Sequence, residues 1–181
     1  AVKDPFLNPR KNMARSADRN MLHKRVSRYG FCVIDAIDRE ILRLLQNDGR
    51  MSATALAARV GLTVAPCHRR IKELERAGVL TGYRAVVDPA AVGLGFQTLV
   101  FVTLRDRTQM LAFEEAVGRH EQIVKADRLF GDPDFLLKVI AADLPGYQQF
   151  YDDVLVNLPG VEKLTSTIVM KTVKEEAGLP L

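Results

Sequence analysis

Residues 52–78 read SATALAARVGLTVAPCHRRIKELERAG, and this stretch decides the fold of the first part of the chain. The pattern predicts two short helices joined by a tight turn. Ser52 is suited to cap the first helix, which is rich in Ala and Leu, and Gly61 permits the conformation that ends it. Thr63 is suited to cap the second helix, and Gly78 follows its end. A helix-turn-helix of this kind places its second helix in the major groove of DNA.

The second helix has an apolar and a cationic side. Cys67, Ile71 and Leu74 are spaced four and three residues apart, so they form one apolar stripe. The residues that we expect to meet DNA are Thr63, Ala65, Pro66, His68, Arg69, Arg70 and Lys72. A solvated amphipathic helix in a bundle is the plainer alternative, because charged faces are common and Glu73 and Glu75 dilute the positive charge.

Length and composition fit two small domains. The chain has 181 residues, of which 48% are hydrophobic, and this is enough for compact cores. No apolar run approaches the ~20 residues that cross a membrane, and no secretory signal is visible. Two cysteines are too few for a disulfide framework, so we expect reduced thiols, no metal site and a cytoplasmic protein.

Charge is distributed unevenly along the chain. Residues 1–30 hold eight Lys/Arg against two Asp, a net charge of +6, whereas residues 96–181 hold nine basic against thirteen acidic residues, a net charge of −4. The basic front can attract phosphates, and the acidic rear is unsuited to lie along DNA.

We expect four segments in the chain. They are a basic N-terminal leader or arm at 1–30, the helix-turn-helix domain at 31–82, a strand and linker at 83–95, and a second domain at 96–181. A supporting helix at 36–47 is expected, with Asp35 as its cap. A strand or short wing is expected at 79–88, and a helix at 16–29 that is either a phosphate-binding arm, a packed helix or an added leader.

The second domain alternates strands and helices. Strands are expected at 96–105, 122–130, 134–141 and 161–174, and helices at 108–118 and from about 144 to 158. Thr108 and Asp143 are the expected caps of these two helices, and Leu111, Phe113 and Val117 the apolar contacts of the first. The order βαββαβ predicts a ferredoxin-like sandwich with both helices on one face, so the whole chain is of the α+β class.

The uncovered face of this sheet predicts self-association. Phe101, Val102 and Leu104 make that face too apolar for water. A second copy of the same sheet is the simplest cover, so we expect a homodimer.

These segments together resemble the leucine-responsive regulator/AsnC family, also called feast/famine regulators. The resemblance runs from about 34 to 175 and is carried by IDAIDREILRLLQNDGRMS, LAARVGLTVAPCHRRIKELERAGVLTGYRAVVDP, GDPDFLL and TSTIVMKTVK. It implies a transcriptional regulator that binds double-stranded DNA through the helix-turn-helix. It also implies a sandwich domain that pairs into dimers, often assembles into octamers, and senses an amino acid or related metabolite.

The resemblance also suggests residue roles. Arg69 is expected to pair with guanine O6/N7, and Arg70 and Lys72 to hold phosphates. The effector is expected near the turn between the second and third strands, and the candidate residues are Gly131, Asp132, Asp134, Thr165, Ser166 and Thr167. An ordinary Asp-rich hairpin turn is the alternative, and Pro133 removes a backbone donor there.

Two other functions stay open at this point. The first is an architectural DNA-wrapping protein without an effector, and the second a metabolite-binding domain or enzyme with a helical assembly module. An enzyme is not expected, because His23, His68 and His120 share no predicted cleft with a nucleophile or paired carboxylates. The sequence also holds no Gly-rich phosphate loop.

Overall fold

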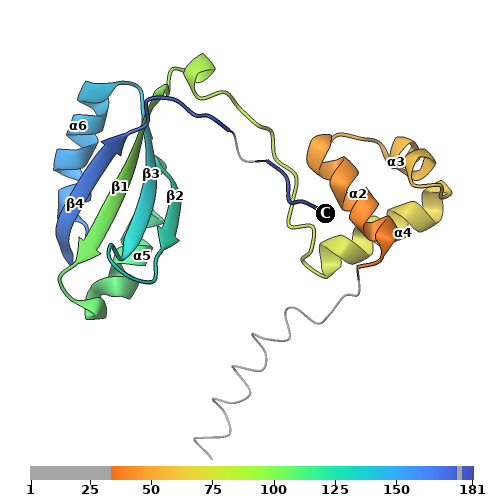
Figure 1. Cartoon of the computed structure of the whole chain (residues 1–181), viewed down its shortest axis with the longest axis horizontal. Helices are drawn as coiled ribbons and strands as arrows, with labels where there is room; N and C mark the ends of the chain where they lie inside the picture. Colours follow the sequence, from red (N-terminus) through yellow and green to blue (C-terminus); the bar gives the residue numbers. More distant parts are fainter. Residues whose placement is uncertain (1–33, 175–176) are drawn as a thin grey trace, which may run out of the picture. The chain divides into compact units, whose positions relative to one another are not determined.

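The computed structural model describes residues 34–174 and 177–181, which form two compact units (Figure 1). The first unit comprises the described residues up to Ala85 together with 177–181, and the second the described residues from Val86. The leader expected at 1–30 and its helix at 16–29 lie outside the described residues. Within the described residues, no helix combines the length and the apolar character needed to cross a membrane.

Three helices build the first unit. They are α2 (Ala36–Asn47), α3 (Ala53–Arg59) and α4 (Val64–Arg76). Asp35 caps α2 by accepting a hydrogen bond from the Asp38 backbone N–H, and the Asp38 side chain accepts one from the Asp35 N–H in return. Ser52 caps α3 by accepting from the Ala55 N–H at 3.2 Å. These two caps confirm the predicted helix starts.

One apolar core holds the three helices together. Ile41 of α2, Leu56 of α3 and Cys67 of α4 are fully buried in it. Ile71 and Leu74 complete the predicted stripe of α4, and both are buried. Burial raises the pKa of the Cys67 thiol, so this cysteine is a packing residue. Each such side chain contributes about 1.5–3 kcal/mol on burial, which fixes the orientation of α4.

The strand or wing expected at 79–88 is absent: this segment bends at 79–80 and forms no strand over 81–88. The strands that the described residues contain all belong to the sheet of the second unit, so the β-branched residues here have no partner. Val86 is accordingly 98% exposed. In the first unit, Gln46 of α2 contacts Leu179 near the end of the chain, because its Oε1 accepts from the Leu179 N–H at 2.5 Å.

The second unit is an antiparallel sheet of four strands with two helices. Its elements are β1 (Phe96–Leu104), α5 (Met110–Val117), β2 (Ile123–Arg128), β3 (Phe135–Ala141), α6 (Leu144–Asp153) and β4 (Val161–Ile168). The strand order is β2-β3-β1-β4. This order and the βαββαβ sequence of elements confirm the predicted ferredoxin-like sandwich.

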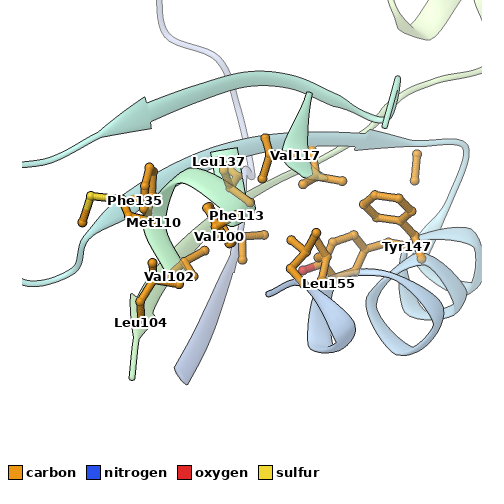
Figure 2. Close-up of a cluster of buried hydrophobic side chains, with 14 residues drawn as sticks. Val100, Val102, Leu104, Met110, Phe113, Val117, Phe135, Leu137, Tyr147 and Leu155 are labelled. Atoms are coloured by element: carbon orange, nitrogen blue, oxygen red, sulfur yellow. The ribbon is translucent and has the colours of Figure 1, made fainter. Parts of the chain in front are cut away.

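Both helices pack on one face of the sheet (Figure 1). Val100 of β1, Leu137 of β3 and Phe113 of α5 are fully buried between the layers. Figure 2 shows this cluster running from Met110 beside Phe135 at one end to Tyr147 at the other.

The expectation for the uncovered face of the sheet was wrong in two residues. Val102 and Leu104 are buried under the helices, whereas Phe101 points to the opposite face with Leu99. Side chains alternate along a strand, so three residues that include consecutive positions cannot share one face.

Helix α5 begins differently from the prediction. Asp106, and not Thr108, accepts the first capping bond, and a short 3₁₀ turn (Arg107–Gln109) precedes α5. The buried contacts of α5 are therefore Met110, Phe113 and Val117, spaced three and four apart. Leu111 falls off this stripe and is 75% exposed, so its expected core contact is absent.

The last strand is shorter than the predicted range 161–174. Its ladder closes where the Val169 N–H donates to the Gln97 carbonyl at 2.9 Å. β1 begins at Phe96 and runs antiparallel to β4, so the chain beyond Val169 has no strand to pair with, and Met170 is 99% exposed. The many β-branched residues of 161–174 did not reveal where the antiparallel partner strand begins.

Candidate functional site: the outward face of helix α4 and the turn between β2 and β3

Helix α4 presents a cationic surface away from its core. Ala65, His68, Arg69 and Lys72 are all exposed, and we call these residues the outward face of α4. The buried stripe of α4 fixes which way they point, because side chains three and four residues apart share a face. The Arg69 side chain is 75% exposed and lies 3.9 Å from Glu73, so its guanidinium is held loosely.

Thr63 and Pro66 lie at the start of the same helix. Thr63 is the N-cap residue by backbone geometry and is exposed, but its side chain makes no capping hydrogen bond. Pro66 is half-buried in the first turn, where a missing N–H leaves no helical bond unmade.

Arg70 is placed differently from the other cations. Its Nη1 donates to Asp35 and to Asp38, at 2.8 Å in each case, and its side chain is only 27% exposed. The hydrogen bonds that Arg70 donates, first to Asp38 and then to Asp35, raise the pKa of Arg70. The structure thus bonds Arg70 to the start of α2 and sets it apart from the outward face of α4.

Lys72 belongs to a small polar network that the sequence did not reveal. Its Nζ lies 2.9 Å from Glu75, and the Tyr83 hydroxyl donates to the same carboxylate at 3.2 Å. The hydrogen bond from Lys72 holds the pKa of Glu75 below its usual value, and burial raises the pKa of Tyr83. Tyr83 follows α4 by several residues, and no spacing rule for helices connects it to Glu75.

The turn between β2 and β3 holds two of the predicted effector residues in hydrogen bonds. Asp134 accepts from the Leu104 N–H at 2.8 Å, and Asp132 accepts from the Thr103 hydroxyl at 3.1 Å. Gly131 has a positive φ of 138°, a conformation that favours glycine. Both carboxylates therefore help to fasten the turn to the end of β1.

The predicted hydroxyl residues of β4 lie on two different faces. Ser166 is on the helix-covered side, where its hydroxyl lies 2.6 Å from that of Tyr147. Thr165 and Thr167 pair with Phe101 and Leu99 of β1, so they share the opposite face. The three hydroxyls consequently do not form one cluster.

The histidines form no catalytic arrangement in the part of the chain that the structure describes. His68 is exposed on α4, and His120 packs edge-on against Phe150 with 5.9 Å between the rings. His23 lies outside the described residues. Within 34–174 and 177–181, no three His, Cys, Asp or Glu side chains gather as a metal site would require.

Two family models match the chain, one in its N-terminal part and one in its C-terminal part. Residues 34–81 match a winged helix-turn-helix DNA-binding model, and residues 97–179 match the Lrp/AsnC ligand binding domain. The first match contains the whole outward face of α4. The second contains the sheet and the turn between β2 and β3.

Curated proteins and solved structures agree with these matches. The leucine-responsive regulatory protein of Escherichia coli K12 is 38% identical over 149 residues, covering 81% of this chain and 90% of that protein. The DNA-binding transcriptional activator DecR of the same organism is 34% identical, and the match covers 82% of this chain and 99% of DecR. A transcriptional regulator of Neisseria meningitidis, solved as a complex with L-Met, is 32% identical with a TM-score of 0.78, covering 82% of this chain and 97% of that chain. An AsnC family transcriptional regulator from Agrobacterium tumefaciens is also 32% identical, with a TM-score of 0.75. The match covers 81% of this chain and 96% of that chain.

Proposed function

This chain belongs to the Lrp/AsnC family of transcriptional regulators, and we propose that it binds operator DNA through helix α4 under the control of an amino acid. The relatives named above are regulators and not enzymes, in line with the sequence-based expectation. The observation that carries the proposal is the outward face of α4, where exposed cations lie opposite a fully packed stripe.

Two exposed cations of α4 take different roles in the proposed complex. Arg69 is free to form a bidentate contact with guanine O6 and N7 in the major groove. Lys72 exchanges Glu75 for a DNA phosphate, which positions the helix without reading sequence. Arg70 holds α4 against α2 in this proposal and does not contact DNA, because both of its acidic partners belong to the same unit.

The open face of the sheet is the proposed dimer interface. We give this name to the side that carries Leu99, Phe101, Leu136 and Ile140. Cross-strand pairing brings Leu136 opposite Phe101, whereas Lys138 lies opposite Leu99 and Gln97 lies opposite Ile140. The apolar side chains of this face are therefore interspersed with two polar ones. A second copy that covers this face presents two α4 helices to half-sites about 34 Å apart on one duplex.

An amino acid is the proposed effector of the sheet unit. The ligand-binding family model and the L-Met complex of the Neisseria meningitidis protein support this chemistry. The turn at Gly131, Asp132 and Asp134 remains one proposed site, with Thr165 and Thr167 on the neighbouring open face. Ligand binding there competes with the bonds that hold the turn, so it can change how dimers assemble.

A DNA titration of the full chain tests the proposal. We expect nanomolar-range binding to a promoter duplex, weaker binding to random duplex, and a steep loss of affinity between low and high salt. Added L-methionine or L-leucine is expected to change the promoter affinity. Binding that ignores every amino acid and protects many helical turns of DNA would favour an architectural protein instead, and no DNA binding at all would reject the regulator.

A further inference from the structure

A small apolar cavity lies between α5 and β2, on the helix-covered side of the sheet. It has a volume of about 280 Å³, and its apolar lining includes Phe113, Val117, Ala126 and Phe135. We call it the α5–β2 niche. Figure 2 shows Phe113, Val117 and Phe135 within the core cluster that forms its floor.

The niche exists because β2 carries a small residue at this place. Ala126 pairs with Leu137 of β3, so both side chains point toward the helices. Leu137 is fully buried, whereas the methyl group of Ala126 is too short to fill the space below α5. The space is therefore built by the register of β2 and does not arise from a loose loop.

The mouth of the niche carries one cation and one anion. Arg128 lies two residues beyond Ala126 on the same face of β2, and its Nη1 is 3.5 Å from Glu114 of α5. The Arg128 and Glu114 side chains are 56% and 40% exposed, so solvent screens this long ion pair and it contributes little to stability. A ligand that offers both opposite charges can replace it at little cost.

We infer that the α5–β2 niche binds a free α-amino acid with an apolar side chain. The ligand carboxylate pairs with the planar guanidinium of Arg128, and its ammonium group pairs with Glu114. The apolar side chain enters the niche and covers Val117. This inference rests on the proposed amino-acid response and adds a site apart from the turn between β2 and β3, where both carboxylates already have partners.

The size and lining of the niche narrow the ligand class. Pockets for drug-sized ligands have volumes of about 300–1,000 Å³, so a cavity of about 280 Å³ suits a single amino acid. The rings of Phe113 and Phe135 lie 4.6 Å apart, and a thioether makes favourable contacts with aromatic rings. L-Methionine is therefore expected to bind better than L-leucine, and charged amino acids are expected to be excluded.

Calorimetric titration of the full chain with L-methionine tests this site. Ala126→Leu fills the niche and Arg128→Met removes the carboxylate partner, so each is expected to weaken binding about tenfold or more. Ala112→Leu, on the exposed side of α5, and Arg119→Met, which removes the exposed partner of Glu115, are the matched controls and are expected to bind as wild type does. N-acetyl-methionine, which lacks the ammonium group, is expected to bind wild type weakly.

The outcomes separate the niche from the proposed function. If wild type binds L-methionine and Ala126→Leu and Arg128→Met bind it equally well, the niche is not the site, and loss on Asp132→Asn would then assign the ligand to the turn. If wild type binds no amino acid, the effector part of the proposed function fails together with the niche. If Ala126→Leu fails to fold, NMR spectra of wild type test the site instead. We expect the Val117 methyl signals to shift on adding L-methionine, and unmoved signals would overturn the proposed site.

Discussion

The Nη1 atom of Arg70 lies 2.8 Å from a carboxylate oxygen of Asp38, which bonds helix α4 to the first turn of α2. The Asp38 side chain is only 11% exposed, so this ion pair is shielded from water more than any exposed pair on α4. Arg70 is thus a positioning residue that holds α4 against the first turn of α2.

Replacing Arg70 by Met should lower the free energy of unfolding by about 1 kcal/mol, because the largely buried Asp38 carboxylate then lacks its cationic partner. Urea denaturation of the full chain measures this change. Arg69→Met, on the adjacent exposed position, is the control and should stay within about 0.5 kcal/mol of wild type. Equal stability of the two variants would show that the Arg70 bonds do not hold the helices.

Acid should weaken the first unit through Asp35. The Asp38 backbone N–H, and next to it Arg70, lower the pKa of Asp35 in the folded state. A lowered folded pKa gives stability that is present above the unfolded pKa, near ~3.9, and is lost as pH falls through the folded pKa. Asp35→Asn should flatten this acid limb of the stability curve, whereas Asp152→Asn, at an exposed position of the second unit, should leave it unchanged.

Arg69 and Lys72 should separate sequence reading from general DNA affinity. Arg69→Ala should cost about 1–3 kcal/mol on the operator and little on random duplex, because it removes a base contact. Lys72→Ala should weaken both about equally and reduce the salt slope by about 1. Fluorescence anisotropy at several salt concentrations measures both, and an identical pattern for the two variants would contradict the assignment.

Tyr147 and Ser166 should act as a coupled pair in the second unit. Burial raises the pKa of Tyr147, and its hydroxyl lies 2.6 Å from that of Ser166. Tyr147→Phe and Ser166→Ala should each cost about 1 kcal/mol, with the double variant costing less than their sum. Additive losses in thermal unfolding would mean that the two hydroxyls do not stabilise each other.

The open face of the sheet should control the oligomeric state. Phe101→Asp places a charge beside Leu136 on this face and should release monomers, which light scattering after size exclusion detects. Leu111→Asp is the matched control on α5, where the side chain is already 75% exposed, and its mass should match wild type. A Phe101→Asp variant that keeps the wild-type mass would place the interface elsewhere.

Local signals explain what the sequence could predict. The caps at Asp35, Ser52 and Asp143 and the stripe of α4 lie within a few residues of one another, so a pattern suffices to find them. The order of strands and helices in the second unit followed in the same way. Errors appeared where the answer depends on a distant partner: β4 ends beside the first residues of β1, and the segment around Val86 has no strand to pair with.

Side-chain partners were the least predictable part of the site. In the sequence, Arg70 cannot be told apart from the other cations of α4. Only the packing of α2 beside it reveals the ion pairs with Asp35 and Asp38. Tyr83 lies beyond the end of α4, so the i, i+3 and i, i+4 spacings of a helix do not predict its hydrogen bond to Glu75. The sequence alone does not predict a cavity at Ala126. The cavity becomes evident only when the register of β2 and β3 shows the space left beside this small side chain.

DNA affinity after charge reversal on α4 tests the central claim most directly. Arg69→Glu combined with Lys72→Glu changes the outward face of α4, and Arg107→Glu combined with Arg119→Glu makes the same change in net charge on the second unit. We predict that the first pair abolishes operator binding in anisotropy titrations while the second pair preserves most of it. Equal losses from the two pairs, or operator binding that survives the first, would contradict DNA recognition by this helix.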